Sequence, residues 1–203
     1  TRNKGVKRSD ADYFLFMTQD AVPVDEYLIE ELAKSLEQDE VAIAYARQLP
    51  EENSNPIEKY TRAFNYPEHS YVRTQKDLPK YGIKTFFCSN VCAMDKREVF
   101  VSLGGFVNHT IFNEDMIFAA KAIQAGYGIA YNAGAKVVHS HNYSSKEQFH
   151  RNFDIGVSQA DYPNIFSAYP SESEGIKMVK QTADYLKENR MRNLIPTLVI
   201  RSG

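Results

Sequence analysis

Short apolar runs recur along the chain and are separated by amphipathic or polar stretches. Five of these runs have the length of buried strands: Tyr13–Met17, Val41–Ala46, Thr85–Met94, Ile129–Tyr131 and Lys136–His139. Between them, apolar residues return at the spacing of one helix face. Strands that alternate with helices in this way predict an α/β fold.

The helices are recognised by a single apolar face. After Asp25, where a helix is expected to begin, leucines recur every fourth residue at Leu28, Leu32 and Leu36. A second amphipathic helix is expected over 114–126, because apolar residues stand at i, i+3, i+4 and i+7 and Gly126 ends the pattern.

Residues 47–84 are polar and contain four prolines, so they predict a long irregular segment with one short helix near 57–64. Such long loops are often functional. After the strand expected over 85–94, Asp95 and Glu98 resemble a capping box. This pattern predicts a short helix that Gly104-Gly105 ends.

The composition is that of a globular protein, with 43% apolar and 25% charged residues. The net charge of −2, with both signs interspersed, excludes a basic field that would attract nucleic acid, and no run of about 18 apolar residues could span a bilayer. With only two cysteines and no signal-peptide pattern, a reducing cytoplasmic setting is expected. The absence of an initiating methionine suggests a piece of a longer protein.

Asp20 is the first candidate for chemistry, because it closely follows the apolar run over 13–17. In an open α/β sheet, ligands collect beyond the carboxyl ends of the strands, which is where Asp20 would lie. A turn aspartate that bonds its own backbone explains the position equally well. Position alone leaves both interpretations open.

Glu114 and Asp115 form an acidic pair in the first turn of the second helix. The helix macrodipole stabilises carboxylates there, so helix capping could explain the pair. The preceding glycine-containing segment over 104–113 could carry a substrate to these acids. A carboxylate within reach of an attacking hydroxyl could then take its proton.

His139 and His141 follow the last expected strand. Alternation along an extended chain would place both rings on one side, where they could bind a common metal or ligand. Structural histidines are the more common case. Taken together with Asp20, the oxygen and imidazole donors suit Mn²⁺ or Mg²⁺ better than a closed zinc site.

Two further groups have simpler explanations. Cys88 and Cys92 could join the histidines at a zinc ion, but their spacing and aromatic surroundings favour buried, inert thiols. Aromatic residues gather around the long polar segment, where they could stack on sugar rings or fill the core: Tyr66, Tyr71, Tyr81, Phe86 and Phe87.

The order of these features resembles that of inverting family 2 glycosyltransferases, which have the GT-A fold. The shared order is an aromatic strand ending in an acid, an amphipathic helix, a long loop, a Ser-Asn strand, GGF, an Asn-Glu-Asp helix and a late histidine. Within the family, "FLFMTQDAVP" and "VVHSHNYS" look most like bacterial rhamnosyltransferase-type members. The resemblance covers residues 1 to about 156. It implies a Rossmann-related mixed sheet flanked by helices, truncated before its first nucleotide-binding strands.

The resemblance also implies roles for individual residues near the N-terminus. "TRNKG" matches the family's Ala-Arg-Asn-x-Gly segment, which assigns Arg2 and Asn3 to cofactor binding. Thr18-Gln19-Asp20 stands in the place of the Asp-x-Asp motif, so Asp20 would bind the cation on the diphosphate. Thr18 departs from the family pattern at a position that contacts the nucleotide.

Later residues inherit the remaining roles. Asp115 would be the catalytic base on the acceptor hydroxyl, with Glu114 beside it. His139, with His141 as the alternative, would be a further metal or diphosphate ligand. The matching Ser-Asn, GGF and Asn-Glu-Asp segments assign substrate binding to Ser89, Asn90, Gly105, Phe106 and Asn113.

The implied activity is transfer of a single sugar from a nucleotide-diphosphate sugar, with dTDP-rhamnose as a candidate donor, in cell-surface polysaccharide biosynthesis. The acceptor would be a saccharide or a lipid-linked saccharide, and the transfer would invert the anomeric centre. Because the chain has no tryptophan, it lacks the Gln-x-x-Arg-Trp signature of processive members. Without the nucleotide-binding half, the chain by itself is expected to turn over poorly.

Two other functions stay open. One is a non-catalytic module that binds glycans or a partner, and the other is a metal-dependent hydrolase that uses Asp20 and the two histidines. The expected domains are a partial GT-A domain over 1–143 and a helical extension over 144–203, with a break around 163–173. The extension could lie on the inner face of the cell membrane, although a packed helical pair fits better, because no wholly basic amphipathic face is evident.

Overall fold

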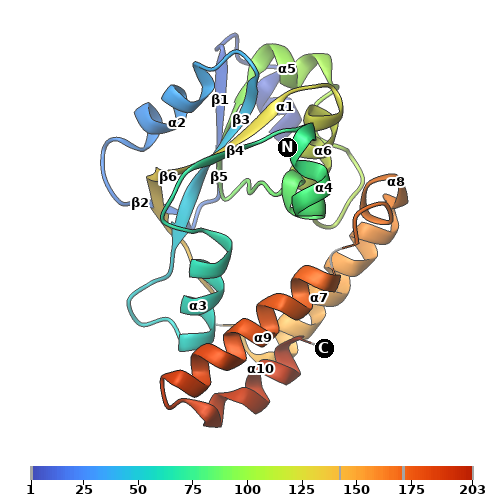
Figure 1. The fold of residues 1–203 in the computed structure, drawn as a ribbon. Helices are drawn as coiled ribbons and strands as arrows, with labels where there is room; N and C mark the ends of the chain where they lie inside the picture. Colours follow the sequence, from blue (N-terminus) through green and yellow to red (C-terminus); the bar gives the residue numbers. More distant parts are fainter. Residues whose placement is uncertain (1, 142, 171, 203) are drawn as a thin grey trace.

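The computed structural model describes residues 2–141, 143–170 and 172–202. It contains one mixed sheet with helices on both faces, and a group of C-terminal helices beside one end of the sheet (Figure 1). The described strands are β1 (Tyr13–Met17), β2 (Val22–Pro23), β3 (Val41–Leu49), β4 (Tyr71–Arg73), β5 (Cys92–Lys96) and β6 (Gly128–Val138).

The strands lie in the order β1-β5-β3-β6-β2, and β4 also pairs with β6. β3 and β6 run parallel, whereas the other pairs are antiparallel. The mixed sheet flanked by helices that the sequence predicts is therefore confirmed.

β6 replaces the two short strands predicted near its ends. Its register against β3 shifts at a bulge, where Ala46 pairs with Asn132 and the next residue of β3 pairs with Lys136. The Asn132 side chain holds this bulge, because its Oδ1 accepts the backbone N–H groups of Gly134 (2.8 Å) and Ala135 (3.1 Å). The polar break in the sequence is thus a bulge within one strand rather than a loop between two.

Two predictions about strands are wrong. The strand expected over 85–94 begins only at Cys92, because residues 82–86 form a 3-10 turn. β1 is only partly buried, with Tyr13 and Met17 exposed by 41% and 44%. β1 lies at an edge of the sheet, so only one of its flanks is paired and only Phe14 is fully enclosed.

Helix α2 (Leu28–Leu36) covers one face of the sheet with the three predicted leucines, all nearly inaccessible to solvent. It packs with Ala44 and Ala46 of β3. The helix begins at Leu28 rather than at Asp25, because the Asp25 side chain accepts the N–H of Tyr27 and forms a turn ahead of it.

The opposite face is covered by α5 (Arg97–Ser102) and α6 (Glu114–Gln124), together with the N-terminal α1 (Arg2–Val6). Ile43 and Tyr45 of β3 point to this side, so alternate residues of one strand fill two separate cores. Phe100 of α5 and Phe118 of α6 pack against each other there, with ring centroids 4.8 Å apart.

The predicted capping role of Asp95 is wrong. Asp95 lies within β5, and the residue at the helix start is Lys96, which makes no side-chain capping bond. The end of α5 is as expected, since Gly104 and Gly105 adopt positive φ angles of 79° and 67°.

The long polar segment is more regular than predicted. It contains the expected helix as α3 (Pro56–Asn65), capped by Asn55, and also β4 and α4 (Leu78–Tyr81). Its aromatic residues fill the core: Tyr66 and Phe86 are buried and Tyr71 and Phe87 are partly buried, while Tyr81 stacks under Arg73. Core packing explains most of this aromatic content.

The C-terminal helices are α7 (Ser145–Ala160), α8 (Pro163–Phe166), α9 (Glu172–Glu188) and α10 (Ile195–Ser202). α8 lies inside the predicted break over 163–173, of which residue 171 is outside the described part. Ile57 of α3, Leu186 of α9 and Leu198 of α10 share a small core of their own. The boundary between the two expected domains stays a prediction.

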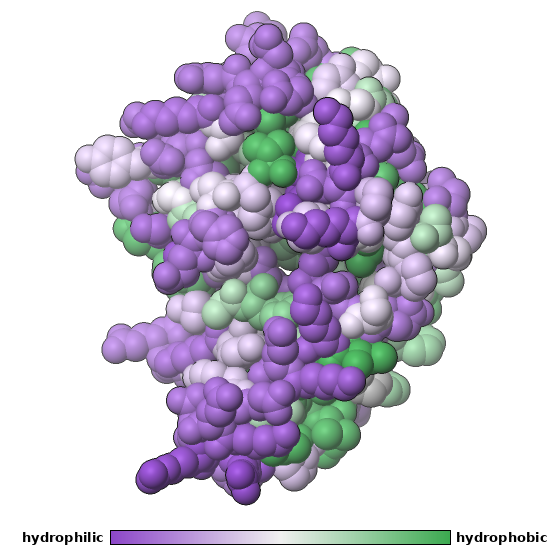
Figure 2. Space-filling model, in the orientation of Figure 1, coloured by the Kyte–Doolittle hydropathy of each residue, from purple (hydrophilic) through white to green (hydrophobic). Residues whose placement is uncertain are grey.

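Hydrophilic residues cover most of the face drawn in Figure 2, and apolar side chains gather mainly over the C-terminal helices. Two apolar side chains of α7, those of Phe149 and Phe153, are exposed by 49% and 63%. Within the described residues, no helix is both long and apolar enough to cross a membrane.

Candidate active site and metal centre

A cleft of about 590 Å³ opens beside the ends of β3 and β6, with walls that include α3, α6 and α7. It brings together residues that are far apart in the sequence. The sequence-predicted residues that line it are Arg2, Thr18, Ser89, Asn90, Asn113, Glu114, Asp115, His139 and His141.

Asp20, His139 and His141 form a cluster at this cleft whose ligand atoms all lie within 4.8 Å of one another. The Oδ2 atom of Asp20 is 3.6 Å from Nε2 of each histidine. Strand pairing explains why Asp20 lies close to the two histidines, because Val22 of β2 pairs with Val138 of β6. Asp20 therefore lies beside the segment that follows β6.

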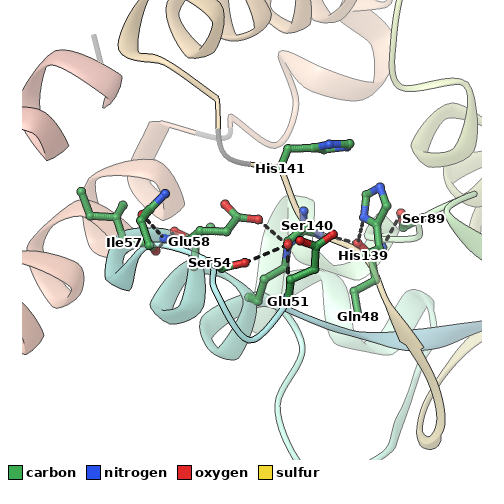
Figure 3. Close-up of polar contacts among 12 residues, drawn as sticks. Gln48, Glu51, Ser54, Ile57, Glu58, Ser89, His139, Ser140 and His141 are labelled. Atoms are coloured by element: carbon green, nitrogen blue, oxygen red, sulfur yellow. Dashed lines mark hydrogen bonds and ion pairs between the residues drawn. The ribbon is translucent and has the colours of Figure 1, made fainter. Parts of the chain in front are cut away.

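The two histidine rings lie on the same side of the chain, with centroids 4.6 Å apart. Ser140 between them points to the other side, where its Oγ lies 2.9 Å from Oγ of Ser54 and accepts the N–H of Glu51 (Figure 3). The two rings differ in exposure, since the side chain of His139 is 7% exposed and that of His141 is 32% exposed. His139 is the more rigidly held of the two.

The charges at this cluster suit a divalent cation. Burial, together with Arg62 and His141, lowers the pKa of His139 to about 4, so its imidazole is neutral at pH 7 and has a lone pair to offer. The neighbouring Thr18 hydroxyl is the first of several causes that lower the pKa of Asp20, so this carboxylate is ionised. One carboxylate and two imidazoles are a donor set that divalent transition metals accept.

Asp115 lies at the start of α6 with both carboxylate oxygens engaged by backbone. Oδ2 accepts the N–H of Asn90 at 3.0 Å and Oδ1 accepts the N–H of Met116 at 2.8 Å. Burial and the neighbouring Glu114 nevertheless raise the pKa of Asp115 to about 6. A carboxylate with such a pKa can accept a proton near neutral pH and release it again.

Glu114 is engaged differently. Its carboxylate forms an ion pair with Arg2, and its Oε1 also accepts Nδ2 of Asn90 at 3.3 Å. The two adjacent acids therefore have different environments. The charge of Glu114 is paired within the chain, whereas Asp115 lines the cleft and forms no ion pair of its own among the described residues.

Four predicted site residues are absent from the cleft lining: Asp20, which lies beside the two lining histidines, and Asn3, Gly105 and Phe106. The Asn3 side chain forms two hydrogen bonds with the loop before α6. Its Nδ2 donates to the carbonyl of Phe106 (2.8 Å), and its Oδ1 accepts the N–H of Phe106 (3.1 Å). A Cβ on Gly105 would meet Phe100 at 2.8 Å. Phe106 is buried among other aromatic rings. Hydrogen bonding accounts for Asn3 and packing accounts for Gly105 and Phe106, so the roles of these three residues in binding remain predictions.

Cys88 and Cys92 are free and buried, as the sequence predicts. Burial raises the pKa of Cys92 to about 12 and raises that of Cys88 as well. Neither thiol belongs to the metal-ligand cluster found in the described part of the chain. Both behave as core residues.

Several residues that line the cleft were not predicted from the sequence, including Gln48, Arg62 and Arg151. Gln48 is the most buried of them at 2% exposure, and it lies near the end of β3. The strand continues three residues beyond Ala46, but Arg47 and Gln48 are both polar and carry no strand signal in the sequence. The polar run that follows was interpreted as a loop instead.

The chain is similar to known glycosyltransferases in sequence. The sequence model of the family named glycosyl transferase family 2 matches residues 1–104 of this chain. Over 191 residues, the chain is 44% identical to O-antigen chain rhamnosyltransferase RfbN of Salmonella typhimurium strain LT2 and 41% identical to O-antigen chain rhamnosyltransferase WbaN of Salmonella anatum. Each match covers 93% of this chain and 61% of the relative. The chain thus spans less than two thirds of the length of these relatives.

The fold is also found among solved structures. The mannosyltransferase PcManGT from Pyrobaculum calidifontis, solved in complex with GDP-Man and Mn²⁺, superposes with a TM-score of 0.59 at 14% identity, covering 98% of this chain and 62% of that one. This similarity confirms the predicted GT-A fold. Because the match to the family model covers just over half of the 203 residues, the chain belongs to glycosyl transferase family 2.

Proposed function

We propose that this protein transfers one sugar from a nucleotide-diphosphate sugar to a saccharide or lipid-linked saccharide acceptor, with inversion, during synthesis of a cell-surface polysaccharide. A rhamnosyl donor such as dTDP-rhamnose is the first candidate, because two curated relatives carry the name O-antigen chain rhamnosyltransferase. The observation that carries the proposal is one cleft lined by two chemically distinct groups, the two histidines that lie beside Asp20 and the carboxylate of Asp115.

Asp115 is proposed as the catalytic base. With a pKa of about 6 it is ionised at pH 7, and it faces the cleft where an acceptor hydroxyl would enter. Removing the proton from that hydroxyl as it attacks makes it a stronger nucleophile. Glu114 and Asn90 are positioning residues in this scheme, since they hold the start of α6 through Arg2 and the backbone.

Asp20, His139 and His141 are proposed to hold a divalent cation. When bound, such a cation stabilises the negative charge that develops on a leaving diphosphate. Two imidazole ligands favour Mn²⁺ over Mg²⁺, because Mg²⁺ prefers oxygen ligands and keeps several waters. The expected order of affinity is therefore Mn²⁺ above Mg²⁺.

Asp20→Ala tests this site. The substitution removes the only carboxylate of the cluster and is expected to weaken Mn²⁺ binding by at least about 100-fold, because loss of a direct ligand costs more than the 10- to 100-fold typical of outer-shell partners. Isothermal titration with Mn²⁺ and Mg²⁺ measures the change. Asp10→Ala, at an exposed position outside the cluster, is the matched control. Unchanged Mn²⁺ affinity in Asp20→Ala would return Asp20 to the role of a turn residue.

A donor screen separates this function from its alternatives. The purified protein is incubated with dTDP-rhamnose or with UDP-sugars, with and without Mn²⁺, and nucleotide release is measured with and without acceptor. Release that depends on acceptor supports transfer. Glycan binding without release would indicate a non-catalytic module, and tightly bound zinc with hydrolysis of the donor alone would indicate a hydrolase.

The proposed place of action is the cytoplasmic face of the cell membrane, where lipid-linked acceptors are accessible. The exposed side chains of Phe149, Phe153 and Ile176 on the C-terminal helices support peripheral association. The same helices also pack on one another and on α3, which agrees with the helical pair that the sequence favours.

A further inference from the structure

Gln48 contacts three polar groups beneath the histidine cluster. Its Oε1 lies 3.0 Å from Nδ1 of His139 and also accepts a hydrogen bond from Nη1 of Arg62. Its Nε2 donates to Oγ of Ser89 at 2.9 Å. Gln48, labelled in Figure 3 near His139 and Ser89, is 2% exposed, so these contacts replace the water that would otherwise satisfy its amide.

Arg62 determines which end of this amide faces the histidine. A guanidinium group has only donors, so the Gln48 atom that it contacts must be the carbonyl oxygen. The Ser89 hydroxyl can donate or accept a hydrogen bond, so it does not determine the orientation of the Gln48 amide. Arg62 is itself held by Glu58, whose Oε1 accepts Nε of Arg62 at 2.8 Å. The amide orientation is therefore set by a charged pair one helical turn apart on α3.

The amide orientation in turn determines the tautomer of His139. A carbonyl oxygen has no hydrogen to donate, so in the neutral ring Nδ1 must carry the proton that joins it to Gln48. The lone pair then resides on Nε2, the atom that lies 3.6 Å from the Asp20 carboxylate. A backbone bond from the His139 N–H to the carbonyl of Leu49 (2.9 Å) fixes the main chain as well.

We propose that Gln48, oriented by Arg62, is a positioning residue that holds His139 in the Nδ1–H tautomer and thereby presents Nε2 as a preformed metal ligand. This inference rests on the proposed metal centre. It assigns different roles to the two histidines, because His141 has no comparable buried acceptor among the contacts described for it and is more exposed. His139 is the rigid ligand, and His141 adapts to it.

The first test needs neither metal nor activity. In ¹⁵N-labelled, metal-free protein at pH 7.5, long-range ¹H–¹⁵N spectra report which nitrogen of His139 is protonated, and His139→Asn identifies its signals. The wild type is expected to show the Nδ1–H tautomer alone. Gln48→Met, which fills the space without an acceptor, is expected to give a mixture of tautomers, whereas Gln48→Glu restores an acceptor and the single tautomer.

Mn²⁺ titration of the same proteins gives the second readout. Gln48→Met is expected to bind Mn²⁺ about 10- to 100-fold more weakly, as for other outer-shell partners of metal ligands. Gln48→Glu should bind at least as well as the wild type, and Gln124→Met, an exposed change on α6, should be neutral. Circular dichroism confirms that each variant is folded.

The outcomes separate this inference from the function on which it rests. An Nε2–H tautomer in the wild type, or full Mn²⁺ affinity with an unchanged tautomer in Gln48→Met, overturns the role of Gln48. A wild type with the Nδ1–H tautomer but no Mn²⁺ affinity contradicts the metal centre and any ligand-positioning role, and leaves only the hydrogen-bond assignment.

Discussion

Asp115→Asn is expected to lower the turnover of sugar transfer by about 10³-fold, within the range that a positioned general base contributes. The amide has nearly the same shape as the carboxylate but cannot accept the proton of the acceptor hydroxyl. Donor binding should remain near normal, because Asp115 acts on the acceptor. Turnover and donor affinity are measured separately, in a form of the protein that transfers sugar.

The neighbouring acid provides the matched control. Glu114→Gln makes the same chemical change one residue away, where the carboxylate is paired with Arg2. Its effect on turnover should be much smaller and should come with a loss of stability at the start of α6. If Glu114→Gln proved as damaging to turnover as Asp115→Asn, or if Asp115→Asn retained transfer, Asp115 would not be the base.

The pH dependence follows from the same residue. Because the pKa of Asp115 is raised to about 6, its base form is lost as the pH falls through that value. We expect kcat/KM to fall about tenfold per pH unit below pH 6 and to level off above pH 7. A profile that is flat between pH 5 and pH 7 would contradict the assignment.

Asp95→Asn is expected to stabilise the protein strongly at neutral pH. Asp95 is 1% exposed in β5, and neither of its carboxylate oxygens has a hydrogen-bond partner among the described residues. Its side chain shares a face of the sheet with Phe14 and Ile43, its partners on β1 and β3. Burial, with a smaller contribution from Asp115, raises its pKa to about 8. The folded protein therefore keeps Asp95 protonated.

The direction of this effect follows from the linkage between proton binding and the free energy of unfolding. Between the unfolded pKa near 4 and the folded pKa near 8, the folded state binds a proton that the unfolded state has released, so stability falls as the pH rises. The loss from this one group between pH 4 and pH 7 is on the order of 4 kcal/mol. An asparagine does not titrate, so the variant should gain over the wild type increasingly with pH.

Urea unfolding of the wild type and of Asp95→Asn at several values between pH 5 and pH 8 measures this gain. Asp10→Asn, at an exposed position, is the control and should show no trend. A smaller decline should persist in Asp95→Asn, because the raised pKa of Asp115 acts in the same direction. A gain that is equal at all pH values would mean that Asp95 is not the titrating group.

Much of the fold could be predicted because it depends on local pattern. The leucines of α2, the apolar face of α6 and the glycines after α5 each identify an element without any long-range information. The failures occurred where tertiary pairing overrides local pattern. Asp95 looks like a helix cap but belongs to a central strand, and the residues over 82–86 look like strand but turn within a 3-10 segment.

The candidate site likewise contains residues that could be predicted from the sequence and residues that could not. The acids and histidines stand out as residue types, and their order along the chain suffices to indicate the family. Gln48 and Arg62 do not stand out, because glutamine and arginine near the end of a strand and on a helix are ordinary surface residues in most proteins. Only their burial against His139 distinguishes them.

The sequence alone determined that Asp20, Glu114-Asp115 and the two histidines are the candidate reactive residues, because residue type and spacing are local properties. The tertiary structure decided which of these residues lie close together and which of them is ion-paired. Pairing of β2 with β6 places Asp20 beside His139 and His141, and the ion pair from Arg2 neutralises Glu114 while Asp115 stays available. These assignments depend on distances between residues that are more than a hundred positions apart, and such distances are set only once the sheet has formed.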